Sequence, residues 1–164
     1  MEPDKTYTSE STTADTSNSA EELVQLTFEE TRVLGSLIEK ELTTPEYYPM
    51  SLNGLVNACN QKNNRLPRTN LSEDEVNQAI EQLRTKRLAH RVDLVGSRVH
   101  KFQHNAEKEL DLIKAERALI AELLNRGPQT TGELNNRADR MFNFDGIQDV
   151  EDTLTDMMER SPSL

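Results

Sequence analysis

The sequence has few of the features that stabilise secreted proteins or anchor membrane proteins. It contains one cysteine, Cys59, which excludes an internal disulfide and a cysteine-rich zinc site. Every apolar run falls short of the roughly 20 residues that span a bilayer. Residues 1–26 also lack the basic and apolar blocks of a signal peptide. We therefore expect a cytoplasmic protein without a membrane partner.

Hydrophobic residues are scarce, at 34% of the chain, and the shortage is concentrated at the N-terminus. Residues 1–26 are rich in serine and threonine and carry six acidic side chains but one lysine. Such a segment cannot bury enough apolar surface to offset the roughly 1–2 kcal/mol of backbone entropy lost per ordered residue. We predict a disordered acidic tail over residues 1–26, followed by two small domains.

Helix-capping motifs organise the first of these domains. Thr27 to Glu30 and Ser72 to Glu75 each place a Ser or Thr three residues before a Glu, a pattern whose side chains bind the free amide groups of a helix start. Ser51 supplies a third cap, and Pro45 and Pro49 separate it from the first helix. Apolar residues recur at helical spacing behind each cap. The sequence predicts helices over 27–42, 51–59 and 72–87.

Between Leu88 and His104, apolar and polar residues alternate, which is the pattern of a half-buried β-strand. Gly96-Ser97 lies midway and suits a two-residue type II′ turn, so we predict a β-hairpin with Arg91 opposite Phe102. Three helices followed by a hairpin is the order of elements in a winged helix-turn-helix domain. We predict one such domain over residues 27–105.

A copy of this pattern occupies residues 106–164. The apolar positions of the first helix reappear as Leu119, Ile120, Leu123 and Leu124. A capping motif from Thr130 to Glu133 and a periodicity through Val150 and Met157 supply two more helices. The sequence stops where a second hairpin is expected. The predicted fold is therefore mainly α-helical with a small hairpin wing, as two tandem winged helix-turn-helix domains of which the second lacks its wing.

Two adjoining runs carry a family resemblance. The run from Leu37 to Gly54 and its continuation from Ala58 to Pro67, with the uncommon sequence Ala-Cys-Asn-Gln-Lys, resemble the YceH-like family of bacterial proteins. The resemblance extends over residues 26–160. It implies two winged-helix domains in tandem, with a second wing that this sequence lacks, and it implies no particular activity.

The charge of the chain is −10 and is distributed unevenly. It is −5 over residues 1–26, −3 over 27–61, +4 over 62–104 and −6 over 105–164. The positive region holds the parts that a winged helix presents to a DNA duplex. Nucleic-acid binding is therefore predicted from nine cations: Lys62, Arg65, Arg68, Arg84, Lys86, Arg87, Arg91, Arg98 and Lys101.

A purely structural interpretation competes with this hypothesis. Arg84, Lys86 and Arg87 end a helix, where cations are favourable without any ligand. The first turn of the same helix, Glu73 to Glu75, would repel phosphate if it entered a groove, although carboxylates also suit a helix start.

Amides and one tyrosine form a second set of candidate contacts with bases or with a protein partner: Asn60, Gln61, Asn63, Asn64 and Tyr47. Amides also cap helix ends and satisfy tight loops, which is the interpretation that we favour. Tyr47 is interpreted likewise as covering the edge of a small core.

Nothing in the sequence supports catalysis or a cofactor. His100 and His104 lie four residues apart on one predicted strand, about 13 Å at ~3.3 Å per residue, which is too far to share a metal. Cys59 falls on an apolar helix face and is interpreted as buried. Gly-rich phosphate loops and nucleophile motifs are absent from the sequence. We expect a protein that is not an enzyme and binds no metal.

Two hypotheses of function follow. The first is a nucleic-acid-binding or regulatory module that contacts double-stranded DNA through the basic region. The second is a non-catalytic adaptor that docks onto a protein partner with the same fold, which the overall acidity favours. A homodimer is also expected, because a predicted helix over 109–126 carries a broad apolar stripe.

Overall fold

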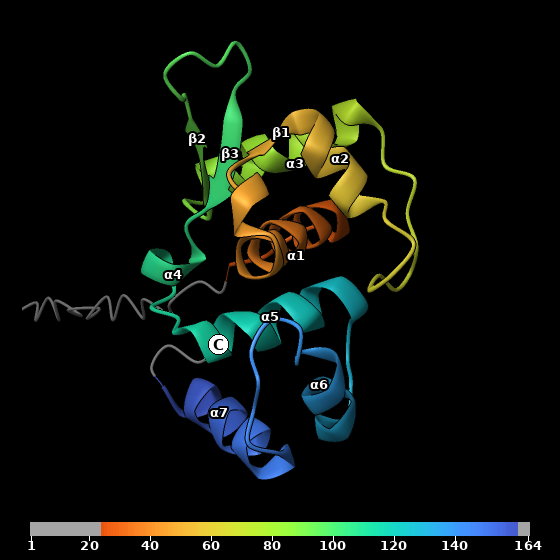
Figure 1. Cartoon of the computed structure of the whole chain (residues 1–164), viewed down its shortest axis with the longest axis vertical. Coiled ribbons are helices and arrows are strands. Elements are labelled where there is room, and N and C mark those ends of the chain that lie inside the picture. Colours follow the sequence, from red (N-terminus) through yellow and green to blue (C-terminus); the bar gives the residue numbers. More distant parts are fainter. Residues whose placement is uncertain (1–23, 161–164) are drawn as a thin grey trace, which may run out of the picture.

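The computed structural model describes residues 24–160, so residues 1–23 of the predicted tail lie outside the described residues. Leu26, assigned to the tail, packs partly against the core. The elements, shown in Figure 1, are α1 (Phe28–Thr43), a short 3-10 helix η1 (Pro45–Tyr47), β1 (Met50–Ser51), α2 (Leu52–Cys59), α3 (Glu73–Thr85), β2 (Ala89–Val92), β3 (Lys101–His104), α4 (Ala106–Glu109), α5 (Lys114–Arg126), α6 (Thr131–Arg137) and α7 (Ile147–Glu159).

The predicted helix starts are confirmed. Thr27 Oγ1 accepts a hydrogen bond from the Glu30 amide at 3.2 Å, and Ser51 Oγ accepts one from the Gly54 amide at 3.1 Å. The Ser72 hydroxyl and the Glu75 carboxylate accept hydrogen bonds from each other's backbone amides at 3.1 and 2.7 Å. Thr130 caps α6 in the same reciprocal way. These caps stop the chain from fraying and fix where α1, α2, α3 and α6 begin.

A three-stranded antiparallel sheet in the order β1-β3-β2 packs beside α1–α3. The predicted hairpin register is confirmed, since Arg91 lies opposite Phe102. The two-residue strand β1 was not predicted from the sequence and pairs Met50 with Phe102 on the other edge of β3. β3 is thereby the central strand, and its buried Phe102 joins the sheet to the core.

The predicted two-residue turn is wrong. Strand pairing ends at Val92 and Lys101, and residues 93–100 form a longer connection, which we call the hairpin loop. Within it the Ser97 amide donates to the Leu94 carbonyl at 3.0 Å, and Gly96 has φ +81°. Gly96 therefore occupies the third position of a turn, where positive φ is needed, and not the second position that a type II′ turn requires.

The predicted helix over 109–126 is also shorter than expected. Asp111 has φ +51°, a left-handed conformation that interrupts the chain between α4 and α5. α5 begins at Lys114, and the Glu116 carboxylate accepts a hydrogen bond from the Ile113 amide at 3.0 Å. The apolar periodicity of the sequence continues across this interruption, which is why it concealed the break.

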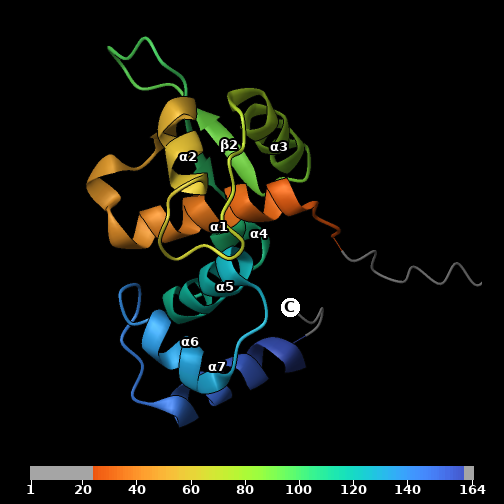
Figure 2. The same ribbon diagram turned by 90° about the vertical axis from the view of Figure 1, so that its right-hand side faces the viewer.

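α5 lies between α1 on one side and α6 and α7 on the other (Figures 1 and 2). Residues of both halves of the chain share one buried apolar cluster, which includes Leu37, Leu83 and Leu119. α1 and α5 approach closely at Gly35, where a Cβ atom would lie 2.6 Å from Asn125 Oδ1. Leu112 and Leu119 of the predicted apolar stripe are buried, and Leu124 packs partly against this cluster, whereas Ile113 is 65% exposed. The homodimer stays a prediction. No helix in residues 24–160 has the length and apolarity to cross a membrane.

Candidate functional site

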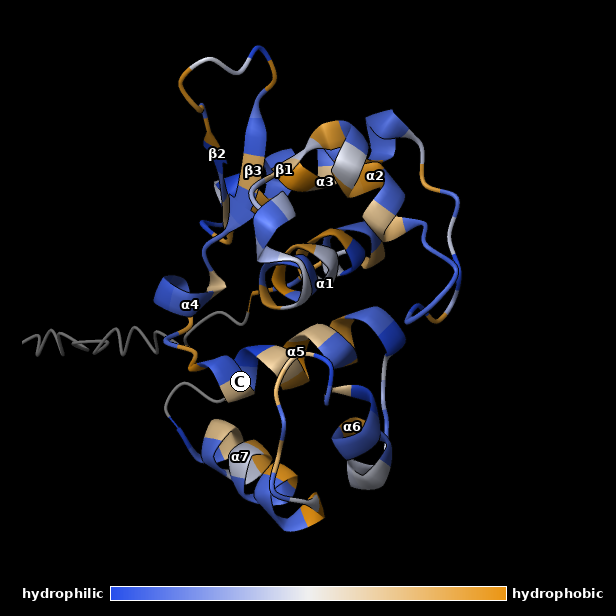
Figure 3. Ribbon diagram, viewed as in Figure 1, coloured by the Kyte–Doolittle hydropathy of each residue, from blue (hydrophilic) through white to orange (hydrophobic). Residues whose placement is uncertain are grey.

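The hairpin loop is the part of residues 24–160 that projects farthest from the helices at the β2–β3 end (Figures 1 and 2). Its apolar side chains face solvent: Leu94 is 45% exposed, Val95 is 107% exposed and Val99 is 55% exposed. Figure 3 shows orange, hydrophobic segments on the two sides of this loop, with pale and blue segments between them at its outermost end. An apolar tip on a polar hairpin is a candidate contact surface.

A groove lies on each side of this hairpin. One, with a volume of about 610 Å³, runs between the hairpin and the first turns of α2 and α3, and is lined by Asn53, Glu73, Asn77, Val99 and Lys101 among others. The other, of about 450 Å³, runs between the hairpin and η1 and is lined by Tyr47, Leu94 and Lys101. Tyr47 is 74% exposed and so does not cover a core edge. Asn53 and Asn77 were not among the predicted contact residues, because isolated amides on helices have no distinctive spacing in a sequence.

Of the nine predicted cations, six belong to α3 and the hairpin or directly follow α3, and three of these six form ion pairs. Arg84 donates to Glu81 at 2.8 Å, and Arg91 lies 3.4 Å from Asp93. Lys86 pairs with the Glu30 carboxylate and donates to the Gln25 carbonyl. Arg87, Arg98 and Lys101 have no carboxylate within ion-pair distance among residues 24–160.

Residues 60–72, which we call the α2–α3 loop, hold three further predicted cations. Arg65 does not face solvent, so its predicted contact with nucleic acid is wrong: its side chain is 0% exposed and donates to both oxygens of Glu39 at 2.8 Å. Lys62 and Arg68 are exposed and unpaired in the described part of the chain. This loop and the hairpin lie on opposite sides of α2 in Figure 1, so the cations do not form one continuous face.

Three of the predicted amide side chains make hydrogen bonds that hold the α2–α3 loop. The Asn60 Oδ1 atom accepts from the Leu71 amide at 2.8 Å and from the Thr69 hydroxyl at 2.9 Å. Asn64 adopts φ +58°, and its Oδ1 atom accepts from Arg126 at 2.7 Å. Gln61 donates to the Asn63 carbonyl at 2.8 Å, while the side chain of Asn63 is exposed. The structural interpretation of Asn60 and Asn64 therefore accounts for their side-chain oxygens.

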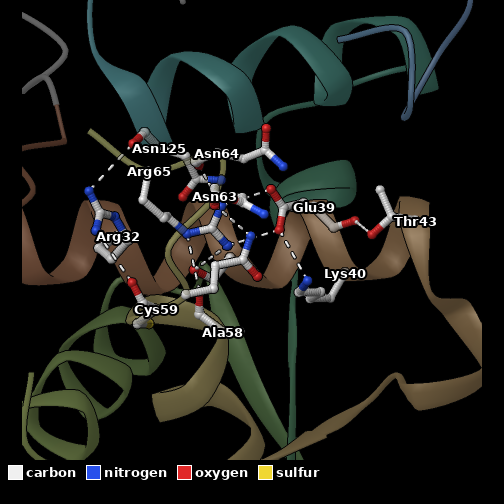
Figure 4. Close-up of polar contacts among 12 residues, drawn as sticks. Arg32, Glu39, Lys40, Thr43, Ala58, Cys59, Asn63, Asn64, Arg65 and Asn125 are labelled. Atoms are coloured by element: carbon white, nitrogen blue, oxygen red, sulfur yellow. Dashed lines mark hydrogen bonds and ion pairs between the residues drawn. The ribbon is translucent and has the colours of Figure 1, made fainter. Parts of the chain in front are cut away.

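A buried network of charges connects this loop to both halves of the chain (Figure 4). Glu39 of α1 receives Arg65 and also Arg140, which follows α6 and lies 2.9 Å from Glu39 and 2.9 Å from Glu122 of α5. Burial disfavours the ionised form of Glu39, but the hydrogen bonds from Arg65 and the charge of Arg140 outweigh it and hold the pKa of Glu39 below its ordinary value. Glu39 is therefore ionised at neutral pH, and both of its carboxylate oxygens contact arginine side chains.

A second cluster, around Glu41, Tyr48 and His104, has the residue types of an acid–base site but not the geometry. His104 Nε2 lies 3.0 Å from Glu41, and His104 Nδ1 accepts a hydrogen bond from the Ala106 amide at 3.1 Å. The Tyr48 hydroxyl accepts from the His104 amide at 2.7 Å, and burial raises the pKa of Tyr48. Both ring nitrogens of His104 thus face protein groups, which leaves neither to move a proton on a substrate.

The remaining reactive groups are inert or dispersed. Cys59 is 0% exposed, and burial raises the pKa of its thiol to about 11, which disfavours the thiolate at neutral pH. Within residues 24–160, no three His, Cys, Asp or Glu side chains come together as metal ligands would. The described surface therefore offers apolar and cationic groups for contact with another molecule.

Comparison with known proteins gives a family. Residues 26–164 match the family described as "Protein of unknown function, DUF480", and the chain belongs to it. It is 54% identical to a UPF0502 protein of Koribacter versatilis over 136 residues, covering 83% of this chain and 63% of that protein. It is 53% identical to one of Citrifermentans bemidjiense, covering 82% and 62%, and 50% identical to one of Geobacter sulfurreducens, covering 82% and 61%. The chain thus spans about three fifths of the length of these relatives.

Proposed function

We propose that this DUF480 protein is a non-catalytic adaptor that docks onto a protein partner through its hairpin loop. In this proposal the chain has two winged helix-turn-helix units in tandem, of the YceH-like kind, and the hairpin is the wing of the first unit. The order α1, β1, α2, α3, β2 and β3 supports that assignment. So does the packing of α1 against α5, the corresponding helices of the sequence repeat.

The exposed apolar tip of the hairpin loop carries the proposal. Leu94, Val95 and Val99 lie within six residues of one another on a projecting loop, and grouped apolar side chains in such a position mark interaction sites. Arg98 and Lys101 flank them without ion-pair partners among residues 24–160. The expected partner surface is therefore an apolar pocket rimmed by carboxylates, since opposite charges at the rim guide and align association.

Nucleic-acid binding is the second candidate, favoured by the exposed Arg98 and by the half-buried Lys101, which lines a groove together with Asn53 and Asn77. Several observations weigh against it. Arg65 is internal, three other cations are paired, and Glu73 lines the groove that a duplex would occupy. A duplex at this face would meet a carboxylate together with Lys101, and the apolar tip would face phosphate.

The adaptor proposal is tested with Val95→Asp/Val99→Asp in the full chain. Tagged wild-type and variant proteins are used to capture partners from an extract of Geobacter sulfurreducens, and each captured protein is then purified and titrated by calorimetry. We expect one partner whose Kd rises at least about tenfold with the variant, equivalent to about 1.4 kcal/mol. Met158→Asp is the matched control, because Met158 is also exposed, at 65%, but lies on α7.

Two results would overturn the adaptor proposal. One is that no captured protein has a Kd that changes with the hairpin variant, or that the α7 control changes the Kd equally. The other is binding of a short labelled duplex, with an affinity that falls as salt rises and falls again in Arg98→Glu. Each phosphate contact should contribute about 0.9 to the slope of log affinity against log salt, so this second result would establish the nucleic-acid candidate instead.

A further inference from the structure

The α2–α3 loop is long for its position. In a helix-turn-helix the two helices need a turn of about three or four residues, whereas here residues 60–72 separate Cys59 from Glu73 with no regular secondary structure. Irregular connections of this length inside a small domain are uncommon and often functional.

Buried polar groups hold the loop in one conformation. The Arg65 guanidinium, besides its two bonds to Glu39, donates to the Ala58 carbonyl at 3.2 Å. The buried Arg32 of α1 donates to the Pro67 carbonyl at 2.8 Å and to the Thr69 hydroxyl at 3.2 Å. Two buried arginines from different elements thus anchor the backbone on both sides of residue 66, as Figure 4 shows for Arg65.

The other half of the chain anchors the loop as well. The Leu66 amide donates to the Asn125 carbonyl at the end of α5, at 2.9 Å. Arg126 donates to the Asn64 side chain at 2.7 Å. Buried charges and amides are costly to leave without partners, so these contacts keep the loop fixed. A fixed loop loses little conformational entropy when it binds a partner.

Exposed side chains of the same loop, from Lys62 to Arg68, are of mixed chemistry and lie within seven residues of one another in the sequence. Leu66 is 65% exposed at its centre. Lys62 and Arg68, on either side of it in the sequence, are exposed and form no ion pair with any residue in 24–160, and Asn63 is exposed between them. We call Lys62, Asn63, Leu66 and Arg68 the loop platform. The loop therefore buries its polar backbone contacts and exposes one apolar group with two cations.

We propose that the loop platform is a second docking surface, which takes an acidic segment of a partner protein. Carboxylates of the segment pair with Lys62 and Arg68, and an apolar side chain of the segment packs on Leu66. The central apolar group favours a peptide over a phosphate backbone, which would leave Leu66 facing charge. The platform lies across α2 from the hairpin, so this proposal does not depend on the function assigned to the hairpin loop.

Photo-crosslinking in the full chain tests the platform. A benzophenone amino acid replaces Asn63, and a matched protein carries it at Asn136 of α6, which is also an exposed asparagine. Both are expressed in Geobacter sulfurreducens and irradiated, and crosslinked peptides are sequenced by mass spectrometry. We expect a protein adduct from position 63 alone, with the crosslinked peptide of the partner rich in aspartate and glutamate.

Charge reversal then tests the chemistry. Lys62→Glu/Arg68→Glu should reduce the adduct about tenfold, equivalent to about 1.4 kcal/mol, while Lys108→Glu/Lys114→Glu, at two exposed lysines elsewhere, should leave it unchanged. Lys62→Gln/Arg68→Gln provides a second variant that introduces no carboxylate, and circular dichroism melts check that each variant folds. The proposal is overturned if the yield of adduct from position 63 does not exceed that from position 136, or if neither platform variant lowers it. It is also overturned if the crosslinked peptide is basic, or if nuclease treatment removes the adduct.

Discussion

Glu39→Gln is the sharpest test of the buried charge network. The substitution keeps the shape of the side chain but leaves Arg65, whose side chain is 0% exposed, without a counter-charge. Removing one partner of a buried ion pair typically costs about 3–5 kcal/mol. In the variant, Arg65 retains its hydrogen bonds to the Ala58 and Asn64 carbonyls, and Arg140 retains its ion pair with Glu122. We therefore expect the unfolding free energy to fall by about 3 kcal/mol, the lower end of this range. With a urea m-value of about 2 kcal/mol/M, the unfolding midpoint should fall by about 1.5 M.

The effect should depend on pH with a definite sign. The pKa of Glu39 is lower in the folded protein than the ordinary value near 4.3 that applies in the unfolded chain, so its ionisation stabilises the fold above that pH. That contribution is lost as pH falls from about 4.3 toward the folded pKa, and the gap between variant and wild type should narrow at about pH 3. Urea titrations at both pH values, followed by circular dichroism, measure it.

The control is Glu81→Gln, because Glu81 pairs with Arg84 at the surface and is 48% exposed. An exposed pair of this kind is worth at most about 0.5 kcal/mol. The reasoning is refuted if Glu39→Gln unfolds within about 1 kcal/mol of wild type at neutral pH, or if the surface control loses as much.

Three further predictions concern single elements. Ser72→Ala removes the cap of α3 and should lower the unfolding free energy by about 1 kcal/mol in urea titrations, whereas no loss would place the start of α3 elsewhere. Gly35→Ala places a Cβ 2.6 Å from Asn125 Oδ1 and should cost about 1–3 kcal/mol, seen as a lower melting temperature; an unchanged melt would mean that α1 and α5 separate easily. Cys59, with a thiol pKa of about 11, should react with iodoacetamide far more slowly in the folded protein at pH 8 than in urea, and equal rates would contradict its burial.

The parts of the fold that local chemistry determines were predictable from the sequence. A capping motif such as Ser72 with Glu75, or Thr130 with Glu133, predicts a helix start, because both side chains and both backbone amides of the motif lie within four residues. The pairing of Arg91 with Phe102 follows from alternation, because the side-chain period of a strand is two and a slip of one residue would turn Phe102 outward.

Features that depend on distant residues were not predictable. β1 has two residues and exists because β3 offers an unpaired edge beside Met50, which no local pattern of residues 50 and 51 reveals. The two-residue turn predicted at Gly96-Ser97 was wrong, because a glycine with positive φ fits the third position of a turn as well as the second. Arg65 was placed on the surface because its partner, Glu39, lies on α1, 26 residues away in the sequence.

Buried carboxylates reduce the positive potential of the region around Arg65. A count of charges by region gives +4 for residues 62–104, but it cannot distinguish a cation that faces solvent from one whose field a buried carboxylate cancels. Glu39 lies outside that region in sequence and neutralises Arg65 inside the protein, and Glu30 does the same for Lys86 at the surface edge. The potential that a partner meets is therefore weaker and more divided than the count, with one group of free cations at the hairpin and another on the loop platform. Two small cationic rims, each around exposed apolar side chains, suit localised protein contacts better than the continuous track of phosphates along a duplex.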